Sequence, residues 1–189
     1  MPKIRKPSRA DISAVLSDQA VLKKVRNQTI ISKPTIPRKS KSVRKKEANN
    51  RFAEASRWAK EILTEPGMKA LYSKGINSKL SNAQMVAVTD FLTAPVIHYI
   101  NLKQYTGAIG DKIRIKATDD FQVSSVDVTI SDKKGKELEK GPAVHYKRKP
   151  VMWIYTLKLA NAYIAGTVIE VTAKDRPGNT VVKTETVEK

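Results

Sequence analysis

The sequence contains no cysteine, and this absence excludes several classes of protein at once. Without thiols the chain cannot form disulfide bonds, iron–sulfur clusters or Cys-ligated zinc sites, and it cannot use a thiol nucleophile. Its two histidines, His98 and His145, have no Cys, Asp or Glu at a spacing typical of a metal site or a catalytic triad. Gly-x-Ser-x-Gly, Gly-rich phosphate-binding and His-Glu-x-x-His motifs are also missing. We therefore expect a protein that is not an enzyme and holds no cofactor or metal.

Long hydrophobic runs are missing as well. No stretch approaches the roughly 20 apolar residues that a membrane-spanning helix needs. The charged N-terminus, Met-Pro-Lys-Ile-Arg-Lys-Pro, is not followed by the apolar run of a secretory signal. These two observations predict a cytoplasmic protein.

Acidic residues are scarce relative to basic ones, because 18 Asp or Glu face 36 Lys or Arg in 189 residues, which gives a formal charge of +18. Residues 1–50 hold 14 basic and 3 acidic residues, net +11, whereas the blocks 51–100, 101–150 and 151–189 carry +2, +4 and +1. This first quarter has no aromatic residue and few large apolar ones, so it cannot bury enough surface to offset its ordering entropy. Residues 1–47 are thus interpreted as a basic extended arm that becomes ordered on a partner.

Within the arm, apolar residues at near-helical spacing predict one short amphipathic helix over residues 11–25. The cationic stretch 32–46, with two prolines, is expected to be extended. Residues 48–94 show three apolar stripes at helical spacing, interrupted at Pro66, Gly75 and Pro95, and predict a three-helix cluster.

After Pro95 the apolar period changes from near 3.6 to 2, which is typical of half-buried strands. About seven strands are expected between Gly, Asp and Pro turns, and strands of this number and spacing favour an immunoglobulin-like β-sandwich over residues 95–189. Trp153 would lie between its two sheets. The predicted fold class is therefore α+β. The expected strands cover residues 96–102, 113–117, 126–130, 137–146, 152–157, 169–173 and 180–186.

Three segments, residues 110–121, 123–130 and 171–179, carry a family resemblance. The last of them contains an Ala-x-Asp-x-x-Gly-Asn turn, from Ala173 to Asn179. Together they resemble bacterial immunoglobulin-like repeat domains over roughly residues 96–189. The resemblance implies the sandwich fold, and members of this group usually serve outside the cell in adhesion or as spacers. The whole chain is also similar to uncharacterised proteins of Bacteroidetes-type bacteria, which implies a domain arrangement and no known activity.

The concentrated charge of the arm points to a polyphosphate partner. Each Lys or Arg near a phosphate releases condensed counterions, which gives affinity without base reading. We expect sequence-nonspecific binding to DNA or RNA, for example within a ribonucleoprotein or chromosomal assembly; a solvated, solubilising tail is the plainer alternative. Candidate phosphate-binding residues of the arm are Arg5, Lys6, Arg9, Lys23, Lys24, Arg26, Lys33, Arg38, Lys39, Lys41, Arg44, Lys45 and Lys46.

Further cations lie outside the arm. Arg57 is adjacent to Trp58 on a predicted helix, and aromatics beside cations can stack on bases, although core packing also explains Trp58. The run Lys147, Arg148 and Lys149 extends the same charge, or is an ordinary hairpin turn. The arm lacks the Trp or Phe anchors of a membrane-surface helix, so we expect no membrane partner.

Two other functions fit the sequence. The first is a structural assembly protein of a large particle, such as a bacteriophage virion, whose arm threads over neighbouring subunits; the second is an adhesion or spacer domain. In the assembly reading the partner-binding residues are the apolar residues of the predicted arm helix, Ile12, Val15, Leu16, Leu22 and Val25.

Acidic residues also flank the predicted strand ends. Carboxylates so placed can gather around calcium, but Asp is also the ordinary turn residue because its side chain accepts bonds from nearby backbone amides. We expect turns here. The four residues are Asp111, Asp119, Asp120 and Asp175.

Overall fold

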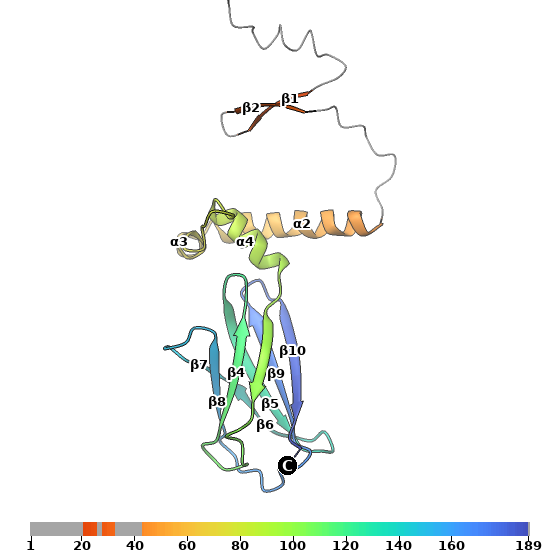
Figure 1. Cartoon of the computed structure of the whole chain (residues 1–189), viewed down its shortest axis with the longest axis vertical. Helices are drawn as coiled ribbons and strands as arrows, with labels where there is room; N and C mark the ends of the chain where they lie inside the picture. The colour runs from red at the N-terminus through yellow and green to blue at the C-terminus, as the bar shows by residue number, and fades with distance from the viewer. Residues whose placement is uncertain (1–20, 26–27, 33–42, 189) are drawn as a thin grey trace, which may run out of the picture. The chain divides into compact units, whose positions relative to one another are not determined.

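The computed structural model describes residues 21–25, 28–32 and 43–188, with side chains from residue 43 onward (Figure 1). The chain divides into a first unit, Met1–Lys46, and a second unit, Glu47–Lys189. The second unit carries the helices and the sandwich, so the predicted α+β class is confirmed. Among the described helices, none is both long and apolar enough to cross a membrane.

In the first unit, β1 (Val21–Val25) and β2 (Gln28–Ser32) pair as an antiparallel hairpin, with Val21 opposite Ser32. The helix predicted over residues 11–25 is therefore wrong at residues 21–25, and residues 11–20 lie outside the described residues. Three of the five β2 residues, Thr29, Ile30 and Ile31, are β-branched and favour an extended backbone. A strand beside such a partner gains ladder hydrogen bonds that a marginal isolated helix cannot match.

Three helices follow: α2 (Val43–Ile62), α3 (Pro66–Ser73) and α4 (Ala83–Leu92). The extended segment expected up to residue 46 is wrong at residues 43–46, because Val43 already begins α2. Arg, Lys, Glu and Ala fill this stretch, and all four are good helix formers. The predicted three-helix cluster is present, and its core is formed by Ala59, Tyr72, Val86 and Ala87.

The strands of the second unit form two four-stranded antiparallel sheets, β10-β9-β5-β6 and β3-β4-β8-β7. Period-two residues fill the space between them, as the alternating burial of Ile113, Ile115 and Ala117 along β4 shows. Trp153 is buried in the same core, as predicted. The strands are β3 (Val96–Asn101), β4 (Lys112–Thr118), β5 (Val123–Ser131), β6 (Glu137–Pro142), β7 (Val144–His145), β8 (Met152–Thr156), β9 (Val168–Asp175) and β10 (Thr180–Thr186).

One predicted strand is divided in two. The segment expected as a single strand over residues 137–146 changes sheet near the buried Ala143: β6 pairs with β5, whereas β7 pairs with β8. The described residues 95–188 thus carry eight strands where about seven were expected. Alternation along a strand reports which side is buried and cannot show which neighbour supplies the hydrogen bonds.

The helices pack on one end of the sandwich (Figure 1). Phe121, in the turn between β4 and β5, stacks on Tyr72 of α3 with ring centroids 4.7 Å apart. Asn179, at the start of the turn before β10, donates through Nδ2 to the carbonyl of Phe91 at 3.1 Å, near the C-terminal end of α4. Arg51 of α2 donates to the Leu92 carbonyl at 3.2 Å. These contacts hold helices and sandwich together as one unit.

Candidate nucleic-acid interface

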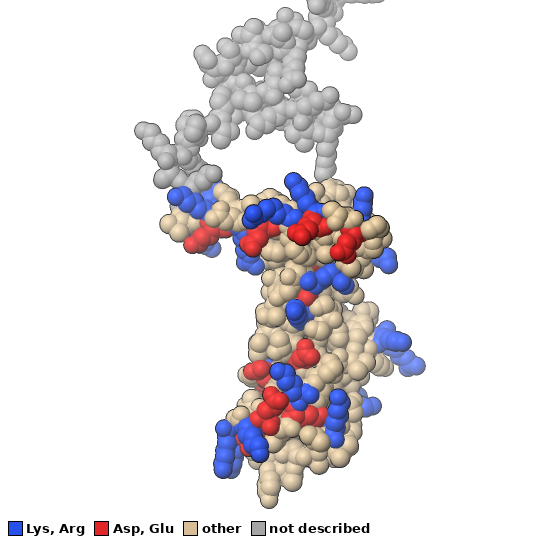
Figure 2. Space-filling view, turned by 180° about the vertical axis from the view of Figure 1, so that it is seen from behind, with Lys and Arg blue, Asp and Glu red and all other residues tan. Residues whose placement is uncertain are grey.

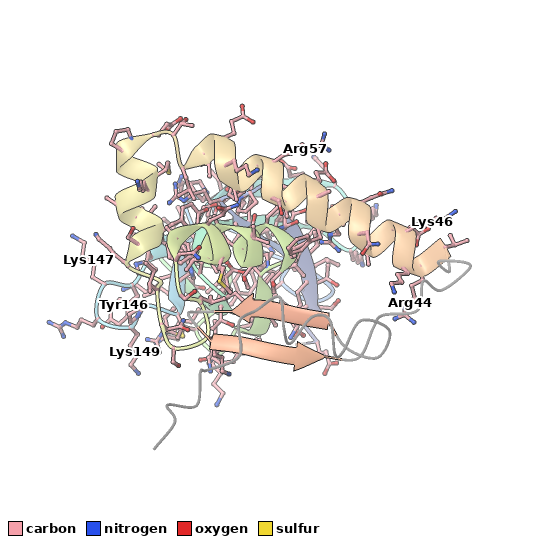
Figure 3. The ribbon with its side chains drawn as sticks, turned by 90° about the horizontal axis from the view of Figure 1, so that it is seen from above. Arg44, Lys46, Arg57, Tyr146, Lys147 and Lys149 are labelled. Atoms are coloured by element: carbon pink, nitrogen blue, oxygen red, sulfur yellow. The ribbon has the colours of Figure 1, made fainter. Side chains whose placement is uncertain are left out.

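The first described group of cations lies at the N-terminal end of α2. Arg44, Lys45 and Lys46 are exposed, and no acidic residue occupies the first turn. The unpaired N–H groups of a helix start already carry partial positive charge, and these three cations add to it. Arg44 and Lys46 project from opposite sides of the helix (Figure 3).

Farther along α2, Arg57 is exposed and follows Lys46 by eleven residues. Eleven residues are about three helical turns, so the two cations lie on the same face of α2, as Figure 3 shows. Its neighbour Trp58 packs against Tyr72 and Phe91, with ring centroids 6.2 and 5.5 Å apart. Trp58 is therefore part of the helical core, and the alternative of base stacking by this residue loses its ring face.

The second group forms the loop between β7 and β8, which we call the basic loop: Tyr146, Lys147, Arg148 and Lys149. All four residues are exposed. The loop is a fixed turn, because the Tyr146 N–H donates to the Met152 carbonyl at 2.8 Å and the Lys149 N–H donates to the Tyr146 carbonyl at 2.9 Å. Three consecutive cations and one aromatic ring are thereby presented to solvent from an ordered backbone.

These cations have little competition from acidic side chains. Among the side chains of residues 43–188, the recorded salt bridge joins Lys183 and Glu185 at 3.7 Å. Within that part of the chain, Arg57 and the basic loop therefore have no carboxylate partner, and their charges are available to an anion.

The described cations do not gather into one patch. Figure 2 shows basic and acidic side chains interspersed over the helical part on the face seen there. In Figure 3 the labelled loop residues Tyr146, Lys147 and Lys149 lie well apart from Arg57. Within the second unit, a ligand that reached both would have to be long, as a nucleic acid is.

Many predicted site residues cannot be placed. Lys23 and Lys24 lie in β1, as do Leu22 and Val25 of the predicted partner-binding set. The remaining predicted residues of the arm lie outside the described residues: Arg5, Lys6, Arg9, Arg26, Lys33, Arg38, Lys39, Lys41, Ile12, Val15 and Leu16.

The turn roles predicted for strand-end aspartates are confirmed at three positions. Asp111 accepts from the backbone N–H groups of Thr106 and Ala108, and these bonds lower the pKa of its carboxyl. Asp119 accepts from Gln122 N–H at 3.2 Å, and Asp175 accepts from Gly178 N–H at 2.8 Å. Asp120 is exposed.

The sequence analysis missed two features. Tyr146 was not singled out, although an aromatic residue immediately before three cations is visible in the sequence. Asp90, on α4, is fully buried beside Asp119 and Asp175. Since Asp90 lies 85 residues before Asp175 in the chain, no local pattern indicates that they meet. We refer to Asp90, Asp119 and Asp175 as the junction carboxylates.

The chain matches no protein-family model and no curated protein. It is similar to an engineered protein of solved structure, with 20% identity and a TM-score of 0.36 over 50% of this chain and 19% of that chain. It is similar to CopC from Methylosinus trichosporium, with 16% identity and a TM-score of 0.35 over 48% of this chain and 87% of that chain. A tetra-tandem repeat from the extending region of a large adhesion protein has 18% identity and a TM-score of 0.33, over 49% of this chain and 22% of that chain.

Proposed function

We propose that this protein binds DNA or RNA through the phosphate backbone, without reading sequence. The observation that supports the proposal most strongly is the charge of +18, of which residues 1–50 carry +11. Phosphate groups along the ligand would release counterions at each Lys or Arg, so the arm supplies most of the affinity. Binding of this kind needs no catalytic group, and we propose a non-enzymatic, cytoplasmic role.

The second unit would add weaker, fixed contacts. The basic loop offers three cations without carboxylate partners among the described side chains, and Tyr146 offers a ring on which an unpaired base can stack. At the start of α2, a phosphate would meet both side-chain cations and unpaired backbone N–H groups. We also propose that the sandwich is immunoglobulin-like, because β3-β4-β8-β7 facing β10-β9-β5-β6 follows the A-B-E-D and G-F-C order of that fold.

The test is salt-dependent binding of the full chain to labelled duplex DNA and to structured RNA. Log K should fall linearly with log salt, with a slope of about −0.9 per phosphate contact on duplex DNA. Replacing Lys147, Arg148 and Lys149 with alanine should reduce that slope by about two or three contacts' worth. Removing residues 1–46 should reduce it much further.

A second loop provides a matched control, because Lys133, Lys134 and Lys136 carry the same charge beside acidic Asp132. Their replacement with alanine should change the slope less than replacement of the basic loop. Equal effects would show that net charge alone, and no particular loop, sets the affinity. Absence of binding at low salt to either polymer would refute the proposal.

The assembly function remains the second candidate, because one apolar groove favours a protein partner. The groove lies between α2 and α4 and has a volume of about 340 Å³. Phe52 and Met85 line it and are 56% and 40% exposed. If nucleic acid does not bind, Phe52→Asp should abolish co-sedimentation with a large particle while leaving the fold intact; an unchanged sedimentation profile would exclude this candidate.

A further inference from the structure

Three carboxylates converge where the helices meet the sandwich. Asp90 comes from α4, Asp119 follows β4, and Asp175 ends β9, and one oxygen of each lies within 4.8 Å of the others. Asp90 and Asp175 are fully buried. Three negative charges from separate elements are thus brought together in a space that water does not reach freely.

Each carboxylate is anchored by donors of this chain. Asp90 accepts through Oδ2 from the Tyr72 hydroxyl at 2.6 Å. Asp119 accepts through Oδ2 from the backbone N–H of Gln122, and Asp175 accepts through Oδ2 from Asn179 Nδ2 at 2.6 Å. These bonds fix the orientation of all three side chains.

Two oxygens have no such donor. Asp90 Oδ1 and Asp119 Oδ1 are buried and have no hydrogen-bond partner among the described residues. A buried carboxylate oxygen without a partner is costly, and proteins usually satisfy such a group with a proton, a cation or a water molecule. Burial raises the pKa of Asp90 to about 7; the Tyr72 hydrogen bond lowers it, and the charges of Asp119 and Asp175 raise it.

We propose that the junction carboxylates hold one divalent cation, with Ca²⁺ as the best fit, which joins α4 to the sandwich. The available donors are all oxygen and mostly anionic, which suits hard cations. Ca²⁺ binds oxygen at about 2.3–2.6 Å, so ligands on opposite sides of the ion lie about 4.8 Å apart. Mg²⁺, with bonds of about 2.0–2.1 Å, would require the oxygens to move closer together.

The site would act as a cross-link between parts of the second unit. Asp90 belongs to the helical cluster, whereas Asp119 and Asp175 belong to the sandwich. Because the ion would bind the folded unit and not the separated carboxylates of the unfolded chain, it would stabilise the fold by mass action. The cross-link is independent of nucleic-acid binding, since none of the three carboxylates belongs to the basic loop or to α2.

The experiment uses the full chain, stripped of metal with a chelator and then dialysed. Calorimetric titration with CaCl₂ alone should give one ion per chain, and saturating Ca²⁺ should raise Tm by about 5 °C or more. Failure of Ca²⁺ to produce heat or a Tm shift at millimolar concentration would overturn the proposal, and would indicate that the cluster holds a proton.

Two substitutions separate a cation site from general charge effects. In Asp119→Asn the amide can keep the turn and donate a hydrogen bond to Asp90 Oδ1, so the variant should fold at least as stably without metal but lose the Ca²⁺ response. Asp120→Asn makes the same charge change at the adjacent exposed residue and should keep the response. A response retained in Asp119→Asn, or lost equally in Asp120→Asn, would contradict the assignment.

Discussion

Replacing Asn179 with alanine should weaken the second unit where helices and sandwich meet. The Nδ2 group carries two hydrogens, and its two shortest contacts are Asp175 Oδ2 at 2.6 Å and the Phe91 carbonyl at 3.1 Å. A hydrogen bond to a charged group contributes about 1.5–3 kcal/mol and a neutral one about 0.5–1.5 kcal/mol. The free energy of unfolding should therefore fall by about 2–4 kcal/mol. For a unit of this size Tm should fall by about 5–15 °C.

The assay is thermal and urea unfolding of the second unit within the full chain. Far-UV circular dichroism follows the helices, and the two tryptophans report on separate parts, Trp58 on the helical core and Trp153 on the sandwich. In the wild type these signals should change in one transition. In Asn179→Ala the helical signal should be lost first, because its attachment to the sandwich is weakened.

A matched asparagine provides the control. Asn50 is exposed on α2, and its replacement by alanine should change stability by less than about 0.5 kcal/mol. An unchanged Tm in Asn179→Ala would refute the reasoning. Separate unfolding of the helices and the sandwich in the wild type would refute it equally, since the bonds of Asn179 would then couple nothing.

Three further substitutions test the sandwich. Glu139→Ala should cost about 2–4 kcal/mol in urea unfolding, because the buried Tyr155 hydroxyl loses an acceptor 2.6 Å away and two backbone N–H groups lose theirs. Gly107→Ala should destabilise severely, because Gly107 has φ of +85° and a Cβ there would lie 2.1 Å from the Asn161 carbonyl oxygen. Asp111→Asn should lower Tm at neutral pH but not in strong acid. The pKa of Asp111 is lowered in the folded state, so its stabilisation is present above its unfolded pKa and is lost as pH falls through the folded value.

Each of these substitutions has a contradicting outcome. Glu137 is exposed on the same strand, so Glu137→Ala should be nearly neutral, and an equal loss there would remove the argument from burial. Gly110 has φ of +91° but open space around it, so Gly110→Ala should cost less than Gly107→Ala. A Tm difference between wild type and Asp111→Asn that persists unchanged below about pH 2 would contradict the titration argument.

The sequence by itself determined the elements of the second unit and the sign of the charge. Apolar periods of 3.6 and 2 indicate which side of each element is buried, and this depends on neighbours a few residues away. The alternation of Ile113, Ile115 and Ala117 therefore predicted β4 correctly, and the helices were predicted in the correct order. Charge is additive, so the excess of basic residues needs no structure to be recognised.

Tertiary structure alone decided which elements meet. Strand pairing turned residues 21–25 from a predicted helix into β1, and it moved the chain between sheets at Ala143. The same holds for Asn179, which the sequence identified only as the end of a turn and which in the structure bonds the end of α4. The junction carboxylates came together because α4 packs on the strand ends that carry Asp119 and Asp175. Contacts between residues so distant in the chain depend on how whole elements pack, and a local pattern carries no information about that packing.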